Sequence, residues 1–133
     1  MKYMKYILCL IATAIFPLCF TGCGDGEVTY SIPIQHWKDA DVRVETHPNP
    51  PLAGMSEVVV IITGPRGRPI PDISVSIRGR ESAPWVQTIQ DGMIGVYRRA
   101  VDIGEGEATV LQVRLQLGVE EKILLYPLKL ARG

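Results

Sequence analysis

Four side chains beyond residue 23 are soft metal ligands: His36, His47, Met55 and Met93. Histidine and methionine together are typical ligands of copper. His36 and His47 are near enough in sequence to approach each other, but no two of the four have the tight spacing of a metal motif. Two interpretations stay open: a copper site, or no metal at all, with solvated histidines and packed methionines. We expect the second, and no cofactor.

Catalytic groups are scarce. A nucleophile needs a base within hydrogen-bond reach, and the chain has only two histidines, both near the start of the part that follows residue 22. The acidic pairs Glu120-Glu121 and Glu105/Glu107 fall in turn-like stretches, where charge is usually solvated. The sequence therefore predicts no catalytic residue and no enzyme activity.

Arginines gather in two short stretches, "RGRPIP" and "IRGRESAPW". Arginine recognises carboxylate and phosphate groups with two parallel hydrogen bonds, and both arginine and tryptophan are enriched at binding hot spots. If neighbouring loops bring the two stretches together, they form a patch for an acidic partner or for lipid headgroups. The alternative is scattered surface arginines and a tryptophan that covers the edge of the domain. The candidate partner-binding residues are Arg66, Arg68, Arg78, Arg80 and Trp85.

The N-terminus has the pattern of a secretory signal. Lys2 and Lys5 precede the apolar run "YILCLIATAIFPLCF", which is followed by the small residues Thr21 and Gly22. The run is shorter than the roughly 20 apolar residues of a membrane span, and Pro17 interrupts it. We therefore expect residues 1–22 to be a signal peptide that is removed.

The end of this signal, Phe20-Thr21-Gly22-Cys23, resembles the lipobox of bacterial lipoproteins. The resemblance implies cleavage before Cys23, a diacylglyceryl group on its thiol, and a lasting membrane anchor, because several acyl chains hold a protein stably. Gly24 follows the cysteine, where many Gram-negative lipoproteins that stay at the inner membrane have aspartate. We expect a lipid-anchored envelope protein, with the outer membrane, facing the periplasm, favoured over the inner membrane.

Cysteine count and charge restrict the remaining chemistry. Cys9 and Cys19 leave with the signal and Cys23 carries lipid, so no disulfide remains. Loss of Lys2 and Lys5 leaves 12 basic residues against 14 acidic ones, a net charge of about −2. This balance argues against a nucleic-acid partner.

The chain after the signal divides into two parts. Residues 23–40 mix glycine, acid and proline without periodicity, which predicts a lipidated cysteine and a flexible tether. Residues 41–133 have a period of two, as in "DVRVET", "ISVSIR" and "TVLQVRLQL", with the β-branched run "SEVVVIIT" between them. A chain that begins near Asp39 should therefore contain the whole core.

About seven short strands separated by proline- and glycine-rich turns predict a single all-β domain, an immunoglobulin-like β-sandwich, which we expect to be monomeric. Pro127 lies inside the last run, "LLYPLKL", and cannot donate to a strand ladder. The last strand is therefore predicted to be an edge strand or to be bulged at Pro127.

The stretches "HPNPPLAGMSEVVVIITGPRGRPIPDISVSI" and "DGMIGVYRRAVDIGEGEATVLQVRL" resemble the YtkA-like and FixH-like family of small secreted or membrane-tethered sandwich domains. The shared elements are Pro48–Gly54, Gly67-Arg68-Pro69, Gly95-Val96-Tyr97 and Gly106. The resemblance implies the same fold and, as an alternative function, copper handling or respiratory assembly. The methionine-rich stretch of some members is replaced here by "GRESAPWVQTIQD". Our expectation is therefore a non-catalytic envelope module that binds an unidentified protein partner.

We predict that Cys23→Ser abolishes lipid attachment, because a serine hydroxyl does not replace the thiol that accepts the lipid. Detergent phase partitioning of the expressed chain measures this. If the variant enters the detergent phase as fully as the wild type, an uncleaved apolar segment is the anchor instead.

Overall fold

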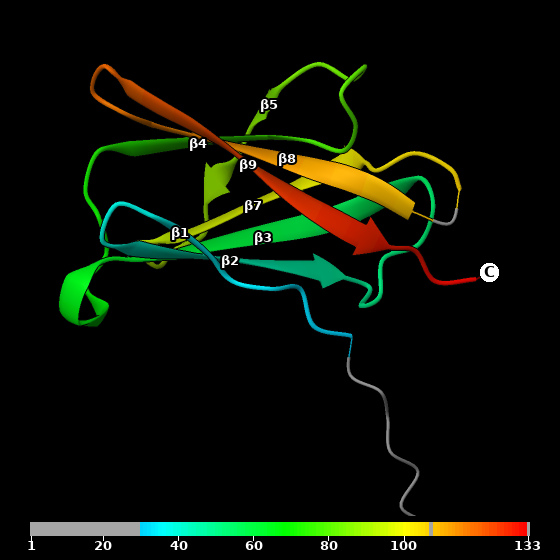
Figure 1. The fold of residues 1–133 in the computed structure, drawn as a ribbon, viewed down its shortest axis with the longest axis horizontal. Helices are drawn as coiled ribbons and strands as arrows, with labels where there is room; N and C mark the ends of the chain where they lie inside the picture. The colour runs from blue at the N-terminus through cyan, green and yellow to red at the C-terminus, as the bar shows by residue number, and fades with distance from the viewer. Residues whose placement is uncertain (1–29, 107, 133) are drawn as a thin grey trace, which may run out of the picture.

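The computed structural model describes residues 30–106 and 108–132, which form two antiparallel sheets stacked face to face (Figure 1). The five-stranded sheet has the order β1-β2-β3-β7-β6, and the four-stranded sheet has the order β5-β4-β8-β9. The strands are β1 (Gln35–Trp37), β2 (Ala40–His47), β3 (Met55–Thr63), β4 (Ile73–Arg78), β5 (Val86–Gln87), β6 (Ile89–Gln90), β7 (Val96–Asp102), β8 (Ala108–Leu117) and β9 (Glu120–Lys129). One 3-10 turn, η1 (Pro65–Gly67), lies between β3 and β4. The predicted signal peptide and Cys23 lie outside the described residues.

The core follows the alternation of the sequence. Every second residue of β2 and β4 is buried, including Val42, Val44, Val75 and Ile77, because successive side chains of a strand point to opposite faces. Ile77 of β4 pairs with Val113 of β8, which is also fully buried. The predicted β-sandwich is confirmed, and two of the strands not expected from the sequence, β5 and β6, are two residues long.

The first described residues belong to the domain. Ile32 is buried in the core with only 8% of its surface exposed, and Tyr30 packs against the same cluster. β1 forms a tight hairpin with β2, in which Trp37 pairs with Ala40. The prediction of a flexible tether is therefore wrong for residues 30–40, and a chain that begins at Asp39 would lack β1 and a buried isoleucine. The sequence signal was weak because Pro33 and the short β1 leave no room for a periodic pattern.

Strand β9 is an edge strand, as Pro127 predicted. The main-chain groups of Leu125 and Lys129 point outward from the sheet, since the carbonyl of Leu125 accepts from the Gln35 side chain and the amide of Lys129 donates to the Tyr30 hydroxyl. Pro127 lies between them and has the same orientation, because main-chain direction alternates along a strand. Its missing N–H therefore costs no bond to β8.

One buried hydroxyl joins the two sheets at this side of the sandwich. Tyr126 of β9 is 1% exposed, and its hydroxyl donates to the carbonyl of Val42 on β2 over 2.9 Å. Burial disfavours the charged phenolate and raises the pKa of Tyr126 well above its ordinary value of 10.0.

We predict that Tyr126→Phe lowers the free energy of unfolding by about 1 kcal/mol, the typical net contribution of one hydrogen bond. The pKa of Tyr126 is higher in the folded state than in the unfolded state, so this residue's contribution is complete below pH 10.0 and is lost as the pH rises above it. Urea unfolding at neutral pH and again above pH 10 measures both effects. If wild type and Tyr126→Phe lose stability equally at alkaline pH, Tyr126 is not the group that titrates.

Candidate functional site

The four arginines singled out in the sequence do not form one patch. Arg66 and Arg68 lie in the loop before β4, whereas Arg78 is the last residue of β4 and Arg80 follows it. A six-residue strand is about 20 Å long, so the two pairs lie at opposite ends of β4. The predicted convergence of the two arginine stretches is therefore wrong, because the strand between them runs straight through the sheet.

Arg80 has a structural role. Its guanidinium lies 3.3 Å from the Asp102 carboxylate at the end of β7. The chain can come so close to β7 because residue 79 is glycine: a Cβ atom there would lie 2.0 Å from the carbonyl oxygen of Asp102. Arg80 thus links the end of β4 to the opposite sheet and is engaged with its own protein.

Arg78 and Trp85 do come together, and they are joined by Arg114 of β8. The guanidinium carbon of Arg78 lies 4.4 Å from the centre of the Trp85 ring, and that of Arg114 lies 4.6 Å from it. Both distances are within the range of cation–π attraction. Arg78 also donates two hydrogen bonds, of 2.8 and 2.7 Å, to the Gln112 side-chain oxygen, which fixes its orientation.

The pairing of the strands explains this cluster. Ile77 and Val113 are fully buried partners on β4 and β8, so the residues that follow them, Arg78 and Arg114, point to the outer face. Val86 of β5 pairs with Ile77 and packs on the core, which places Trp85 on the outer side beside Arg78. Between these large side chains the outer position of β4 holds the small Ser76, which pairs with Arg114.

Sequence reasoning found Arg78 and Trp85 but missed Arg114 and Gln112. Alternation in "TVLQVRLQL" places both missed residues on the outer face. What the sequence does not contain is the register that sets Arg78 opposite Gln112. The matched apolar positions of β4 and β8 are the signal from which this pairing, and with it Arg114 and Gln112, could have been predicted.

The cluster has positive charge without a matching carboxylate. Within residues 30–106 and 108–132, neither Arg78 nor Arg114 forms an ion pair with a carboxylate. Arg80 and Arg98 do form such pairs. The stacked ring orients both guanidinium groups and reduces the entropy that each would lose on binding. Such an arrangement can hold a carboxylate or phosphate group through charge-assisted hydrogen bonds.

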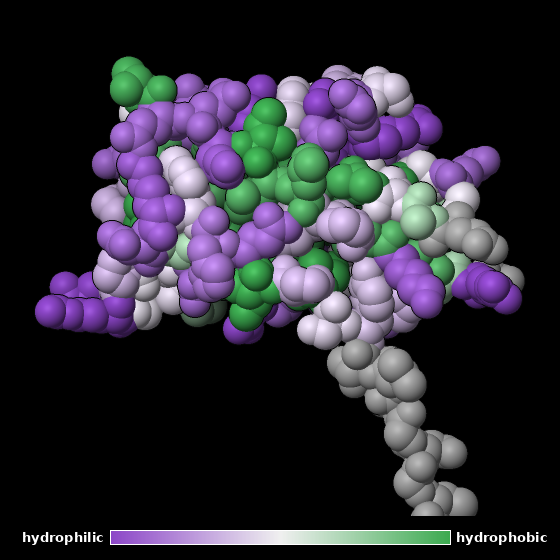
Figure 2. All heavy atoms as spheres, viewed as in Figure 1, coloured by the Kyte–Doolittle hydropathy of each residue, from purple (hydrophilic) through white to green (hydrophobic). Residues whose placement is uncertain are grey.

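An apolar strip adjoins the cluster on the same face. Ile123 pairs with Arg114, Leu125 pairs with Gln112, and Pro127 pairs with Val110. The exposed fractions are 41% for Ile123, 52% for Leu125 and 42% for Val110. Figure 2 shows apolar residues gathered near the middle of the visible face, where β8 and β9 run, with hydrophilic residues around them. We call Arg78, Trp85, Gln112, Arg114 and this strip (Val110, Ile123, Leu125, Pro127) the sheet-face patch.

The four soft metal ligands lie in two separate places. His36 pairs with Asp41 near the start of β2, and its ring nitrogen lies 2.7 Å from the Asp41 carboxylate. His47 ends β2 about 20 Å away and lies near the start of β3, where Met55 is exposed. Met93 precedes β7 at the same end as His36. The expectation that His36 and His47 could approach each other is therefore wrong.

Comparison with protein families, with curated proteins and with solved structures found no match to this chain. Among the residues that the structure describes, no helix is long and apolar enough to cross a membrane. The described part of the chain also contains no group of three or more histidine, cysteine, aspartate or glutamate side chains arranged to hold a metal ion.

We predict that replacing both stacked arginines, Arg78→Ala with Arg114→Ala, shifts the fluorescence emission of Trp85 to longer wavelength. The arginine stems cover part of the ring, and their removal exposes it to water. A Trp37→Phe background removes the second tryptophan. The matched control, Arg66→Ala with Arg68→Ala, changes the same number of charges at the far end of β4 and should leave the emission unchanged. An unshifted spectrum in the first variant would mean that the arginines do not cover Trp85.

Proposed function

We propose that this protein is a lipid-anchored, monomeric module of the bacterial cell envelope, without catalytic activity, that binds an acidic protein partner through its sheet-face patch. The observation that carries the proposal is the pair of guanidinium groups on Trp85, which have no carboxylate partner among the described residues. Guanidinium groups that are fixed on an aromatic ring and have no ion-pair partner contribute more to the recognition of a partner than to folding, because an isolated surface charge adds little to the stability of the fold.

The composition of the patch supports a protein partner. Arginine and tryptophan provide much of the binding energy at protein interfaces, and they do so best when neighbouring apolar contacts exclude water. Ile123 and Leu125 provide such contacts directly beside Arg114 and Gln112. A partner with carboxylates opposite the arginines and apolar side chains opposite the strip would complement both halves of the patch.

The proposed anchor limits where the partner can be. Seven residue steps separate Cys23 from Tyr30, the first described residue, and a fully extended chain of that length spans at most about 25 Å. A domain attached through lipid on Cys23 therefore stays close to the membrane surface. The lipobox resemblance and Gly24 favour the outer membrane and its periplasmic side.

Absence of catalysis is part of the proposal, and the histidines support it. His36 and His47 lie about 20 Å apart along β2, so they cannot serve one reaction centre together. The same separation removes the geometric basis for a copper site built from both histidines. No observation on the structure favours the copper-handling alternative over partner binding.

Site-specific photo-cross-linking in cells tests the proposal. With Leu125→p-benzoylphenylalanine we expect a cross-linked product that is digested by protease, and we expect its yield to fall about tenfold or more when Arg78→Glu and Arg114→Glu are added. In isolated membranes, added salt should lower the yield as well, because exposed charges are screened over about 8 Å at physiological ionic strength.

The control is the charge-matched variant Arg66→Glu with Arg68→Glu, which should retain the product. If the control loses the product to the same extent, net charge and not the sheet-face patch determines binding. A protease-resistant product that contains lipid would show that the patch contacts the membrane, and the proposed protein partner would be wrong.

A further inference from the structure

The connection between β2 and β3 has no charged residue and exposes apolar side chains to solvent. We call residues 48–55, "PNPPLAGM", the apolar loop. Leu52 is 44% exposed, Met55 is 65% exposed, and Ala53 between them is exposed as well. Residues 52–55 thus present only small or apolar side chains at this end of the sandwich.

The main chain of the apolar loop depends little on water for its hydrogen bonds. The carbonyls of Pro51, Leu52 and Gly54 accept hydrogen bonds from within the protein, of 2.8, 3.2 and 3.0 Å. The amide of Gly54 donates to the carbonyl of Gly104 over 2.9 Å. Three residues of the loop are prolines, which have no N–H to hydrate. Such a loop loses few hydrogen bonds when it leaves water for an apolar medium.

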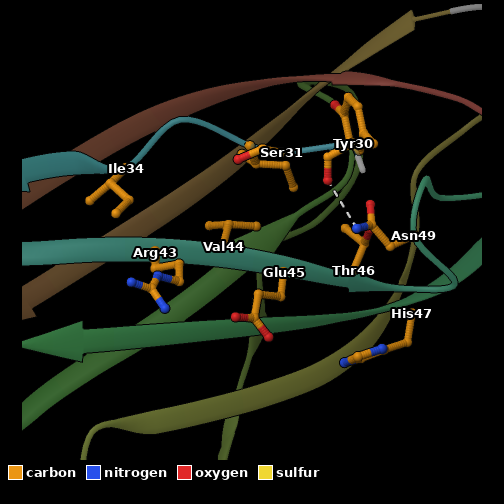
Figure 3. Close-up of a pocket in the computed structure, with 10 residues that line it drawn as sticks. Tyr30, Ser31, Ile34, Arg43, Val44, Glu45, Thr46, His47 and Asn49 are labelled. Atoms are coloured by element: carbon orange, nitrogen blue, oxygen red, sulfur yellow. Dashed lines mark hydrogen bonds between the residues drawn. The ribbon is translucent and has the colours of Figure 1, made fainter. Parts of the chain in front are cut away.

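The apolar loop lies beside the point at which the described chain begins. The Asn49 side chain donates to the carbonyl of Tyr30, the first described residue, over 3.0 Å (Figure 3). The seven residue steps from Tyr30 back to Cys23 span at most about 25 Å. A lipid anchor on Cys23 therefore keeps this end of the sandwich close to the bilayer.

Other exposed apolar side chains lie at the opposite end of the strands. Met93 and Ile94 precede β7, whose first residue pairs with Ile61 near the end of β3, whereas Met55 begins β3. A strand of nine residues is about 30 Å long, so most of the length of the domain separates Met93 from Met55. The apolar loop is therefore at the anchored end, and Met93 and Ile94 are at the far end.

Charged neighbours of the apolar loop restrict how deeply it can enter a bilayer. Met55 pairs with Asp102 of β7, whose carboxylate lies 3.3 Å from the Arg80 guanidinium. Glu105 follows on the connection to β8 and is exposed. Because charges stay in the hydrated headgroup region, Leu52 and Met55 can reach only the upper part of the acyl chains.

We propose that the apolar loop is a membrane-docking site: Leu52 and Met55 insert into the interface of the phospholipid bilayer that holds the anchor, so that the domain stands on this end. The inference rests on the proposed lipid anchor and is independent of the sheet-face patch. Because the anchor makes insertion of the loop an intramolecular event, a weak interaction of two side chains with lipid is sufficient. The anchor provides attachment, and the apolar loop provides orientation.

Tryptophan fluorescence in lipid vesicles tests the proposal. The chain is matured in bacterial cells and reconstituted in phosphatidylcholine vesicles, with Met55→Trp as the reporter. Trp37→Phe and Trp85→Phe remove both native tryptophans. We expect the emission of residue 55 to lie at shorter wavelength than in water, and to fall about twofold or more when the lipid is brominated on the upper part of its acyl chains.

Two matched comparisons make the test specific. Met93→Trp in the same background places the reporter at a methionine of similar exposure, 70%, at the far end of the strands. Its emission should be equal in brominated and ordinary lipid. In the Met55→Trp reporter, Leu52→Asp should remove most of the quenching, because insertion would bury a charge. Ile94→Asp, at an exposed isoleucine of the far end, should leave the quenching unchanged.

Flotation of the vesicles distinguishes failure of this proposal from failure of the anchor. If the chain floats with the vesicles but residue 55 is not quenched, the docking site is wrong and the anchor stands. If the chain does not float, both proposals are wrong. Equal quenching of residues 55 and 93 would mean that the domain lies on its side, and a shift at residue 55 without quenching would mean that protein covers the apolar loop. Either of these results overturns the docking site.

Discussion

The architecture depends on how the two sheets are held together along the side where β2 faces β9. No disulfide is available for this purpose in the described chain, which contains no cysteine. The Tyr126 hydroxyl instead crosses from β9 to the carbonyl of Val42, and Ile32 belongs to the same core. A hydrogen bond inside a dry core has little competition from water, so it fixes the relative position of the sheets as well as adding stability.

The N-terminal segment gives the two edges of the sandwich different properties. Gln35 and Tyr30 satisfy main-chain groups of β9, while the departure of the same segment from β2 leaves Val44 and Thr46 without a backbone partner among the described residues. Residues 30–40, which carry no periodic pattern in the sequence, thus close the β9 edge of the sandwich. The arrangement also brings the start of the described chain next to its end, since Tyr30 contacts Lys129.

The sequence was sufficient for the fold class because alternation is a local property. Val42 with Val44, and Ile73 with Val75 and Ile77, each identify a buried face without knowledge of their partners. Pro127 identified an edge strand for an equally local reason. The site was predictable only in part, because the stacking of Arg114 on Trp85 depends on the β4–β8 register, which pairs Arg78 with Gln112 and Ser76 with Arg114 across more than 30 positions of sequence. The tether boundary failed for the same reason: burial of Ile32 depends on contacts with distant strands and not on its neighbours in sequence.

The closed β9 edge has a consequence for a protein attached to a surface. Molecules held on a membrane diffuse in two dimensions and keep similar orientations, so identical side edges meet far more often than they do in free solution. An open edge strand under these conditions would favour side-by-side growth of a continuous sheet across neighbouring copies. Pro127, with the Gln35 and Tyr30 side chains, removes the bonds that such growth requires. If the proposed lipid anchor holds the domain on a membrane, the capped edge allows a high surface density of separate domains.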